Sequence, residues 1–298
     1  MVVVAVVVFG LLHLSPGDPA AIIAGDQATT QEIEKVRTQL GLDRPLAVQF
    51  ASWLADLARG DLGRSIYDGQ PVAKMIGQRL EPTIALALCT LLVSVLLSVP
   101  LGTIAAWKAG TWIDRTIMGF AVLGFSFPVF VIGYGLIYLF SLTFELLPVQ
   151  GYASLREGIG EFAAHMVMPS LALGWVLTAL FARMTRTSML EVLGQDYIRT
   201  AQAKGLSTAH VLAGHALKNA AVPIVTTIGI GVALLIGGVV VTETVFAIPG
   251  VGLLTVDAIL RRDYPVIQGV VLVFSAVYVL VNLAVDLSYG LFDPRIRY

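Results

Sequence analysis

The stretch TIALALCTLLVSVLLSVPLGTIAAW, residues 83–107, contains no charged side chain and decides the fold class. A membrane-spanning α-helix needs about 20 mainly apolar residues to cross roughly 30 Å of hydrocarbon. Four more windows meet this requirement, at residues 117–144, 162–182, 222–246 and 266–289. The sequence therefore predicts an all-α polytopic membrane protein.

The composition supports this class. The chain has 298 residues, of which 57% are hydrophobic and 13% are charged, and its mean hydropathy is +0.83. Soluble domains are about 45–50% apolar and about 25% charged. The formal net charge of −1 gives no electrostatic reason to expect a nucleic-acid partner. The single cysteine, Cys89, can form no disulfide within the chain.

Residues 1–14 are also apolar, but a helix of this length reaches only about 21 Å. We expect this segment to be the first of six transmembrane helices, truncated at its cytoplasmic start in this sequence. A signal peptide is the alternative, although no basic residue precedes the apolar run and no clean small-x-small cleavage site follows it.

Basic residues predict the orientation, because short cytoplasmic loops of membrane proteins are enriched in Lys and Arg. One assignment places most short-loop basic residues on the cytoplasmic side, namely Lys108, Arg115, Arg183, Arg186, Arg199, Lys204, Lys218, Arg295 and Arg297. The opposite short loops hold only Arg156, Arg261 and Arg262. We therefore expect the C-terminus inside and residues 15–80, the outer segment, outside.

The outer segment contains two predicted helices. TTQEIEKVRTQLG should begin at Thr29 or Thr30, which can cap it, and end at Gly41. LAVQFASWLADLARGDLG should form a second helix, whose apolar face consists of Val48, Phe50, Trp53, Leu54 and Leu57. SPGDP and GLDRP are typical of turns. With so little core of its own, the outer segment should pack on the membrane domain.

Two features stand out within the apolar windows. Ser94, Ser98 and Gly102 recur every fourth residue, which predicts a helix face that a neighbouring helix can approach closely. Pro128 interrupts the window at residues 117–144 and should bend its helix. A bent, aromatic helix could line a translocation pathway or could be a packing kink.

The sequence offers little for catalysis. It contains no G-x-x-x-x-G-K-[ST] phosphate-binding loop and no G-x-S-x-G nucleophile elbow. His210 and His215 are five residues apart, which places them about 140° apart on an α-helix and does not suit a shared metal. Glu243 could pair structurally or meet a substrate ammonium group in an outer vestibule. We predict that the chain is not an enzyme and holds no metal.

One cytoplasmic stretch is polar and helical, YIRTAQAKGLSTAHVLAGHALKNA at residues 197–220. Gly205 can end one helix and Ser207 can cap the next. The second helix should present a smooth face of small side chains and leucines, formed by Leu206, Ala209, Ala213, Ala216 or Leu217, and Ala220. Such a face suits a docking partner, and a connector lying in the headgroup layer is the alternative.

These residues resemble the coupling loop of binding-protein-dependent ABC importer permeases. That loop reads E-A-A, three residues, G, nine residues, then I-x-L-P. Aligned on Gly205, the E-A-A positions are Arg199, Thr200 and Ala201, and the I-x-L-P positions are His215, Ala216, Leu217 and Lys218. The departures are similar to the peptide-transporter branch, in which RTA-x-A-K-G-L and H-A-L-[RK]-N-A are usual. LSPGDP, LGLDRPLAVQF, GDLGRS, ETVFAIPGVG and DPRIRY extend the resemblance to the dipeptide/oligopeptide/nickel permease family.

The resemblance implies a type I importer with four kinds of partner for this chain. They are a second homologous permease, two cytoplasmic ATPase subunits, an extracytoplasmic binding protein and the lipid bilayer. ATP and Mg would be bound by the ATPases, so no cofactor is expected in this chain. It further implies a multi-pass protein of the bacterial or archaeal plasma (inner) membrane.

The implied organisation assigns four parts to the chain: 1–14 as a partial first transmembrane helix, 15–80 as the extracytoplasmic segment, 81–290 as the transmembrane domain and 291–298 as a cytoplasmic tail. The coupling segment, about residues 190–221, would contact the ATPase through Arg199, Thr200, Ala201, Lys204, Gly205, Leu206, His215 and Leu217. Our candidates for the translocation pathway are Phe125, Phe127, Pro128 and Glu243.

The implied function is the uptake of di- or oligopeptides. Within the family, nickel, glutathione or another small substrate is an alternative. An ion-coupled secondary transporter or channel is a hypothesis from another class, and a membrane scaffold without transport is a third.

Overall fold

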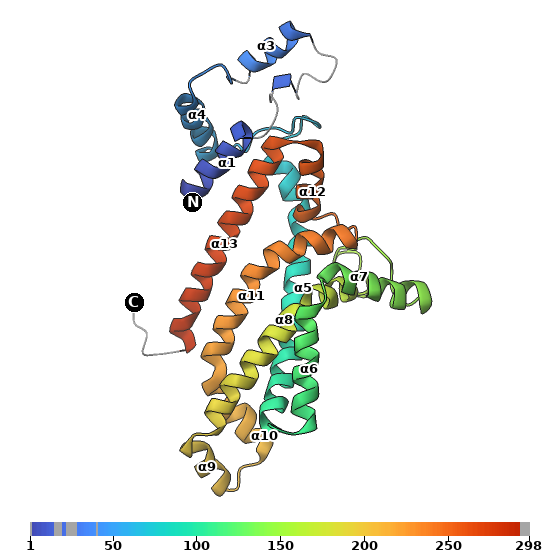
Figure 1. Ribbon diagram of the computed structural model, residues 1–298, viewed down its shortest axis with the longest axis vertical. Helices are drawn as coiled ribbons and strands as arrows, with labels where there is room; N and C mark the ends of the chain where they lie inside the picture. The colour runs from blue at the N-terminus through green and yellow to red at the C-terminus, as the bar shows by residue number, and fades with distance from the viewer. Residues whose placement is uncertain (1, 15–19, 22–28, 40, 293–298) are drawn as a thin grey trace. The chain divides into compact units, whose positions relative to one another are not determined.

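The structure, a computed structural model, describes residues 2–14, 20–21, 29–39 and 41–292 (Figure 1). The described residues form helices joined by turns, together with one isolated bridge between Arg64 and Pro71. The helices are α1 (Val2–Leu14), α3 (Thr30–Gln39), α4 (Leu46–Ala58), α5 (Val72–Trp107), α6 (Trp112–Ser126), α7 (Val129–Leu136), η1 (Ile137–Thr143), α8 (Ile159–Leu193), α9 (Asp196–Ala203), α10 (Thr208–His210), η2 (Val211–Ala216), α11 (Leu217–Val245), α12 (Val251–Arg261) and α13 (Tyr264–Phe292). The predicted SPGDP turn and the DPRIRY tail lie outside the described residues.

The chain divides into two structural units. The first unit comprises residues 1–81 and 253–277, and the second comprises residues 82–252 and 278–298. Helices α5 and α13 contribute residues to both units.

In the first unit, the outer segment packs on the first apolar helix. Phe50 and Trp53, from the predicted apolar face of α4, place their ring centroids 5.2 and 5.7 Å from the ring of Phe9 in α1. Aromatic pairs at this separation stabilise a contact beyond the apolar area that they bury. This contact agrees with the expectation that the outer segment does not stand alone.

Helix α3 begins with a reciprocal capping arrangement. The Thr29 amide donates a hydrogen bond to Glu32 Oε2 at 2.7 Å, and the Glu32 amide donates to Thr29 Oγ1 at 3.4 Å. The Thr29 amide, and after it the Thr29 hydroxyl, lower the pKa of the Glu32 carboxyl from its ordinary value of 4.5. Gly41, with φ 66°, follows the helix. The predicted start at Thr29 and stop at Gly41 are confirmed.

Four helical segments are long and apolar enough to cross a membrane: α5, α8, the continuous stretch from Thr208 to Val245, and Tyr264–Val285 of α13. The window predicted at residues 117–144 is instead two helical pieces, Trp112–Ser126 and Val129–Thr143, which meet at 106°. The described residues thus supply four spans, or five if the bent pair counts as one. Helix α1 has 13 residues, which is shorter than a complete span needs, and the expectation that it is a partial first transmembrane helix stays a prediction.

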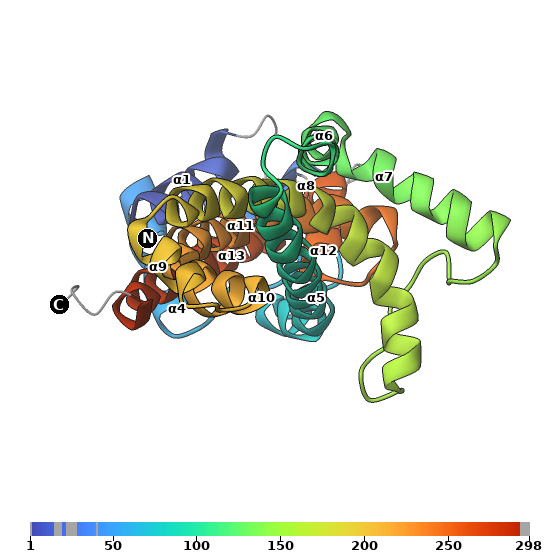
Figure 2. The same cartoon turned by 90° about the horizontal axis from the view of Figure 1, so that it is seen from below.

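The break at Pro128 has a local cause. Proline has no amide hydrogen to donate, and its ring disfavours helical backbone angles at the preceding residue. Phe127 accordingly adopts φ −106° and ψ 129°, and Pro128 becomes the N-cap of α7. Figure 2 looks nearly along α6 and shows α7 lying across the view. The predicted bend is confirmed, and it is large enough to divide the span.

In the second unit, α5 and α8 cross through small side chains. Ser94 and Ser98 are fully buried, and the Ser94 hydroxyl donates a hydrogen bond to the Gly174 carbonyl at 3.2 Å. A Cβ atom placed on Gly102 would lie 2.6 Å from the carbonyl oxygen of Ala182. The predicted close-approach face of α5 is therefore confirmed, and its partner is α8.

Helix α8 lies at the centre of the second unit and packs against α11, α6 and α7. Its largest fully buried side chain is Phe181, whose ring occupies the space that a side chain on Gly231 of α11 would need. The main core joins buried side chains of α5, η1, α8, α11 and the turn after α11, namely Leu86, Ile137, Met166, Met168, Ala172, Leu173, Leu177, Phe181, Leu235, Val239, Val245, Phe246 and Ile248.

Candidate functional site

The coupling segment folds as a helix, a tight turn and a second helix at one end of the second unit (Figure 1). Gly205 has φ 78°, a left-handed angle that glycine adopts without strain. Its amide donates to the Gln202 carbonyl at 2.9 Å, and the Ser207 hydroxyl accepts from the His210 amide at 3.4 Å. The predicted break at Gly205 and the predicted cap at Ser207 are confirmed.

The helix that follows the turn does not continue as an ordinary α-helix. Residues Val211–Ala216 form the π-helix η2, in which hydrogen bonds join residues five apart and one turn holds more residues. The rings of His210 and His215 therefore meet edge to face, with centroids 5.6 Å apart and planes inclined at 63°. The expectation that these rings lie about 140° apart is wrong, because it assumed α-helical rotation.

The π-helix also divides the face that the sequence predicts. Ala216 and Ala220 are fully buried, whereas Leu206, Ala209 and Ala213 are exposed. The extra residue in the π-turn changes the rotation between the two groups. A single smooth face running from Leu206 to Ala220 is therefore absent.

The predicted ATPase-contact residues fall into two groups. Arg199, Thr200, Lys204, Gly205 and Leu206 are exposed around the turn. Ala201 is buried, and His215 and Leu217 are partly buried. The five exposed residues lie on α9 and the turn, where a partner could contact them, while Ala201 is covered by the chain itself.

A small core holds the coupling segment in place. Ile198 and Ala201 of α9 and Val211 of η2 are buried together with side chains of α5, α8 and α11. This second core consists of Ala106, Met189, Ile198, Ala201, Val211, Ala216, Ala220 and Ile224. It joins α9 and η2 to the ends of α5, α8 and α11.

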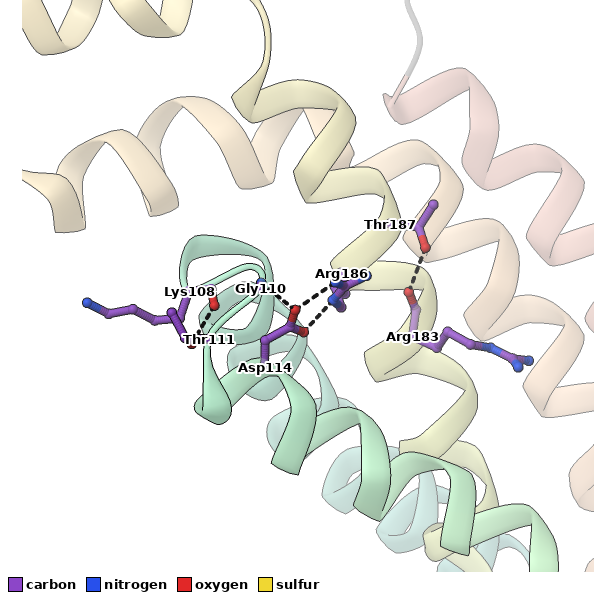
Figure 3. Close-up of polar contacts among 7 residues, drawn as sticks. All are labelled: Lys108, Gly110, Thr111, Asp114, Arg183, Arg186 and Thr187. Atoms are coloured by element: carbon purple, nitrogen blue, oxygen red, sulfur yellow. Dashed lines mark hydrogen bonds and ion pairs between the residues drawn. The ribbon is translucent and has the colours of Figure 1, made fainter.

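A partly buried ion pair lies near the same end of α8 (Figure 3). Arg186 donates from Nε to Asp114 Oδ1 at 2.6 Å and from Nη2 to Asp114 Oδ2 at 2.7 Å. Oδ2 also accepts from the Gly110 amide at 2.9 Å. The two-pronged geometry fixes the start of α6 to α8, because it requires both carboxylate oxygens and two guanidinium nitrogens to align.

We expect Arg186→Gln to lower the melting temperature of the purified permease. Asp114 is buried but the Arg186 side chain is 27% exposed, so the loss should be smaller than the roughly 3–5 kcal/mol typical of a fully buried pair. Arg183→Gln is the matched control, since Arg183 is exposed on the same helix and points away from Asp114 in Figure 3. Equal melting temperatures for the two variants would contradict a structural role for the pair.

The structure places the pathway candidates in two environments. Phe125, Phe127 and Pro128 are exposed at the bend between α6 and α7, and the Arg183 guanidinium lies 5.2 Å from the Phe125 ring centroid. Glu243 is fully buried near the end of α11, where Oε1 accepts a hydrogen bond from the Thr83 hydroxyl at 2.6 Å. In this conformation the Glu243 carboxylate contacts the chain's own turn, and its role in a pathway stays a prediction.

The second unit also contains an apolar cavity of about 220 Å³ between α5, α6 and α8. Its lining is almost entirely hydrocarbon, with Thr178 as its one hydroxyl-bearing residue. Such a cavity lacks the polar groups that orient a peptide, so it does not add residues to the candidate pathway. Within the described ranges, no three His, Cys, Asp or Glu side chains are grouped so that they could hold a metal ion.

The sequence did not predict three features of the second unit. The Asp114–Arg186 pair joins residues 72 positions apart, and the only local signal was an acidic residue in the first turn of an otherwise apolar helix. The π-helix has no recognised sequence signature. Thr83, which contacts Glu243, is an ordinary polar residue at the start of an apolar run.

Two family models together match most of the chain. Residues 98–298 match the binding-protein-dependent transport system inner membrane component, and residues 1–87 match the N-terminal region of the same kind of membrane component.

Relatives match over nearly their full length. A probable peptide ABC transporter permease of Sinorhizobium fredii is 53% identical over 298 residues, which is 100% of this chain and 95% of the relative. A putative peptide transport system permease of Brucella abortus is 43% identical over the same shares. The glutathione transport system permease GsiC of Escherichia coli is 44% identical over 99% of this chain and 94% of its own.

Among solved structures, an inward-facing MetNI methionine ABC transporter chain superposes with a TM-score of 0.61 and 17% identity. The superposition covers 74% of this chain and 96% of that chain. At this identity the match establishes a shared fold.

Proposed function

This chain belongs to the family of binding-protein-dependent transport system inner membrane components, and from that membership we propose that it forms part of a peptide translocation pathway. It is the membrane component of an ABC importer and not its catalytic subunit. We propose that it pairs with a second homologous permease, two cytoplasmic ATPases and an extracytoplasmic binding protein. ATP and Mg would bind only to the ATPases.

The proposal rests mainly on the exposed turn around Gly205. Its surface residues Arg199, Lys204 and Leu206 combine charge and apolar area, and its inward residues pack into the core of the second unit. A partner that contacts the turn can therefore bias the positions of α5, α8 and α11. Such a bias requires the partner to contact two conformations differently, as an ATPase does when it binds and hydrolyses ATP.

The distribution of charge supports a cytoplasmic location for this end of the second unit. Lys108, Arg115, Arg183 and Arg186 flank the ends of α5, α6 and α8, and Arg199, Lys204 and Lys218 lie on the coupling segment. Short loops rich in Lys and Arg remain on the cytoplasmic side. The C-terminus would then also be cytoplasmic, and the outer segment would face the binding protein.

Peptides are the proposed substrate class, because relatives at 53% and 43% identity are named as peptide permeases. The glutathione permease relative, at 44% identity, makes glutathione the second candidate.

Reconstitution tests the proposal. The permease should be co-purified with the ATPases and the binding protein encoded beside it and placed in proteoliposomes. We expect uptake of a labelled dipeptide or oligopeptide that requires both ATP and the binding protein, and competition by unlabelled glutathione or a nickel chelate identifies the alternative substrates. Uptake driven by an ion gradient without the ATPases would overturn the proposal, as would a complex whose ATPase activity does not respond to any substrate.

A further inference from the structure

A chain of two hydrogen bonds joins three segments at the end of α11 that is farthest along the helix from the coupling segment. The Thr83 hydroxyl of α5 donates to Glu243 Oε1 of α11 at 2.6 Å. The Thr83 oxygen accepts from the Val251 amide, at the start of α12, at 2.8 Å. A hydroxyl has one hydrogen and two lone pairs, so Thr83 satisfies both neighbours at once. We call Glu243, Thr83 and the Val251 amide the carboxylate pin.

The pin accounts for the glycines of the turn that follows α11. A Cβ atom on Gly250 would collide with both carboxylate oxygens of Glu243. A Cβ atom on Gly252 would lie 2.9 Å from Glu243 Oε2 and 2.7 Å from the Cα atom of Val240. The carboxylate therefore fills the space beside the turn, and the backbone of the turn can approach it only where side chains are absent.

Other contacts make the turn a defined structure. Ile248 is fully buried, and its amide donates to the Glu243 carbonyl at 2.9 Å. Ala247 has φ 47°, a left-handed angle that costs energy for a residue with a side chain. A strained residue persists where its surroundings fix the backbone on both sides, and the pin does so here.

Helix α11 connects the pin directly to the coupling segment. It runs without interruption from Leu217 to Val245, a length of about 43 Å for its 29 residues. Its first residue follows η2 of the coupling segment, and Glu243 lies in its last turn. Figure 1 shows α11 running from the α10 end of the second unit toward the turn before α12.

We propose that Glu243 is a positioning residue that, through Thr83, holds the outer end of α11 to α5 and to the turn at residues 246–252. The proposal rests on the proposed function, because it assigns the pin the task of passing the movement of the coupling segment to that turn. Without the pin, α11 still moves with the ATPase, but the turn no longer follows it. The carboxylate acts on its own chain and makes no contact with the substrate.

The test uses substitutions at Thr83 in the reconstituted complex. Thr83→Val keeps the shape of the side chain and removes both hydrogen bonds, and Thr83→Ser keeps them. A hydrogen bond to a charged group is worth about tenfold or more in an equilibrium constant. We expect roughly tenfold lower uptake per ATP hydrolysed for Thr83→Val, uptake near the wild-type level for Thr83→Ser, and unchanged ATPase activity without binding protein.

A double-mutant comparison completes the uptake test. If the two residues act as one unit, Glu243→Gln combined with Thr83→Val lowers uptake no further than the stronger single substitution. Additive losses would overturn the pin. A raised KM for substrate in Glu243→Gln but not in Thr83→Val would also overturn it, because that pattern belongs to direct substrate contact.

Hydrogen exchange on the purified permease separates this proposal from the proposed function, since it needs no transport. We expect the Val251 amide to exchange at least about tenfold faster in Thr83→Val than in wild type or Thr83→Ser. Equal exchange in all three proteins would overturn the pin even if uptake is confirmed. Faster exchange together with no ATP-driven uptake by the wild-type complex would retain the pin and reject the importer function.

Discussion

Gly205→Leu is expected to reduce ATP-driven uptake to background while the permease remains inserted and folded. The Gly205 φ of 78° costs a residue with a side chain about 1–2 kcal/mol, and a Cβ atom there meets nothing within 4 Å. The isolated chain therefore tolerates the change. The leucine instead projects from the exposed turn into the space that the proposed ATPase partner would occupy, and a loss of about 1.4 kcal/mol in docking already lowers binding tenfold.

The matched control is Gly60→Leu. Gly60 has φ 82°, meets nothing within 4 Å of its Cβ position, and follows α4 in the outer segment. The two substitutions thus impose the same backbone strain, but only one lies in the coupling segment. Uptake and substrate-stimulated ATPase activity should be lost in Gly205→Leu and retained in Gly60→Leu. Normal uptake by Gly205→Leu would contradict the assignment of the turn to the ATPase interface.

Gly102→Leu is expected to produce the largest loss of stability, because it obstructs the crossing of α5 and α8. The added Cβ would lie 2.6 Å from the Ala182 carbonyl oxygen and 2.6 Å from Thr185 Cβ. Overpacking usually costs about 1–3 kcal/mol, and the cost is at the upper end or beyond where backbone, which cannot rotate away, is the obstacle. The expected result is a lower melting temperature and a smaller yield of purified permease.

Gly77→Leu provides the comparison within the same helix. Gly77 is exposed in α5 and has no neighbour within 4 Å of its Cβ position. Replacing a helical glycine favours the helix by roughly 0.5–1 kcal/mol, so this variant should match or exceed the wild-type melting temperature. A similar fall for both variants would mean that the small-residue crossing contributes little.

The sequence predicted features that depend on nearby residues. The spacing of Ser94, Ser98 and Gly102 is sufficient to place them on one helix face, and Pro128 is sufficient to locate a bend. The spacing does not reveal which helix packs on this face, and the proline does not reveal the 106° angle between the two helical pieces. Both depend on packing between residues distant in the chain. For the same reason the Asp114–Arg186 pair and the Thr83–Glu243 hydrogen bond were not predicted.

The sequence located the exposed turn correctly, but it did not predict which way every side chain around the turn points. The exposed turn at Gly205 is where the sequence places it, and five of its eight predicted contact residues are exposed, namely Arg199, Thr200, Lys204, Gly205 and Leu206. The sequence assigned His215 and Leu217 to the same surface by alignment with the family's coupling-loop pattern. In the structure both side chains are partly buried, and the π-helix Val211–Ala216 contains His215 and directly precedes Leu217.

This π-helix has a consequence for comparing relatives. The direction in which a side chain points depends on the number of residues in each helical turn. The count of residues between Gly205 and His215 therefore does not by itself give the direction of the His215 side chain. Each residue of an α-helix contributes about 100° of rotation, so a one-residue deletion that converts η2 to α-helix can preserve the orientation of α11. For a relative that lacks the π-helix, an alignment with a one-residue gap in this interval pairs residues on the same side of the helix. An ungapped alignment pairs residues that point in different directions.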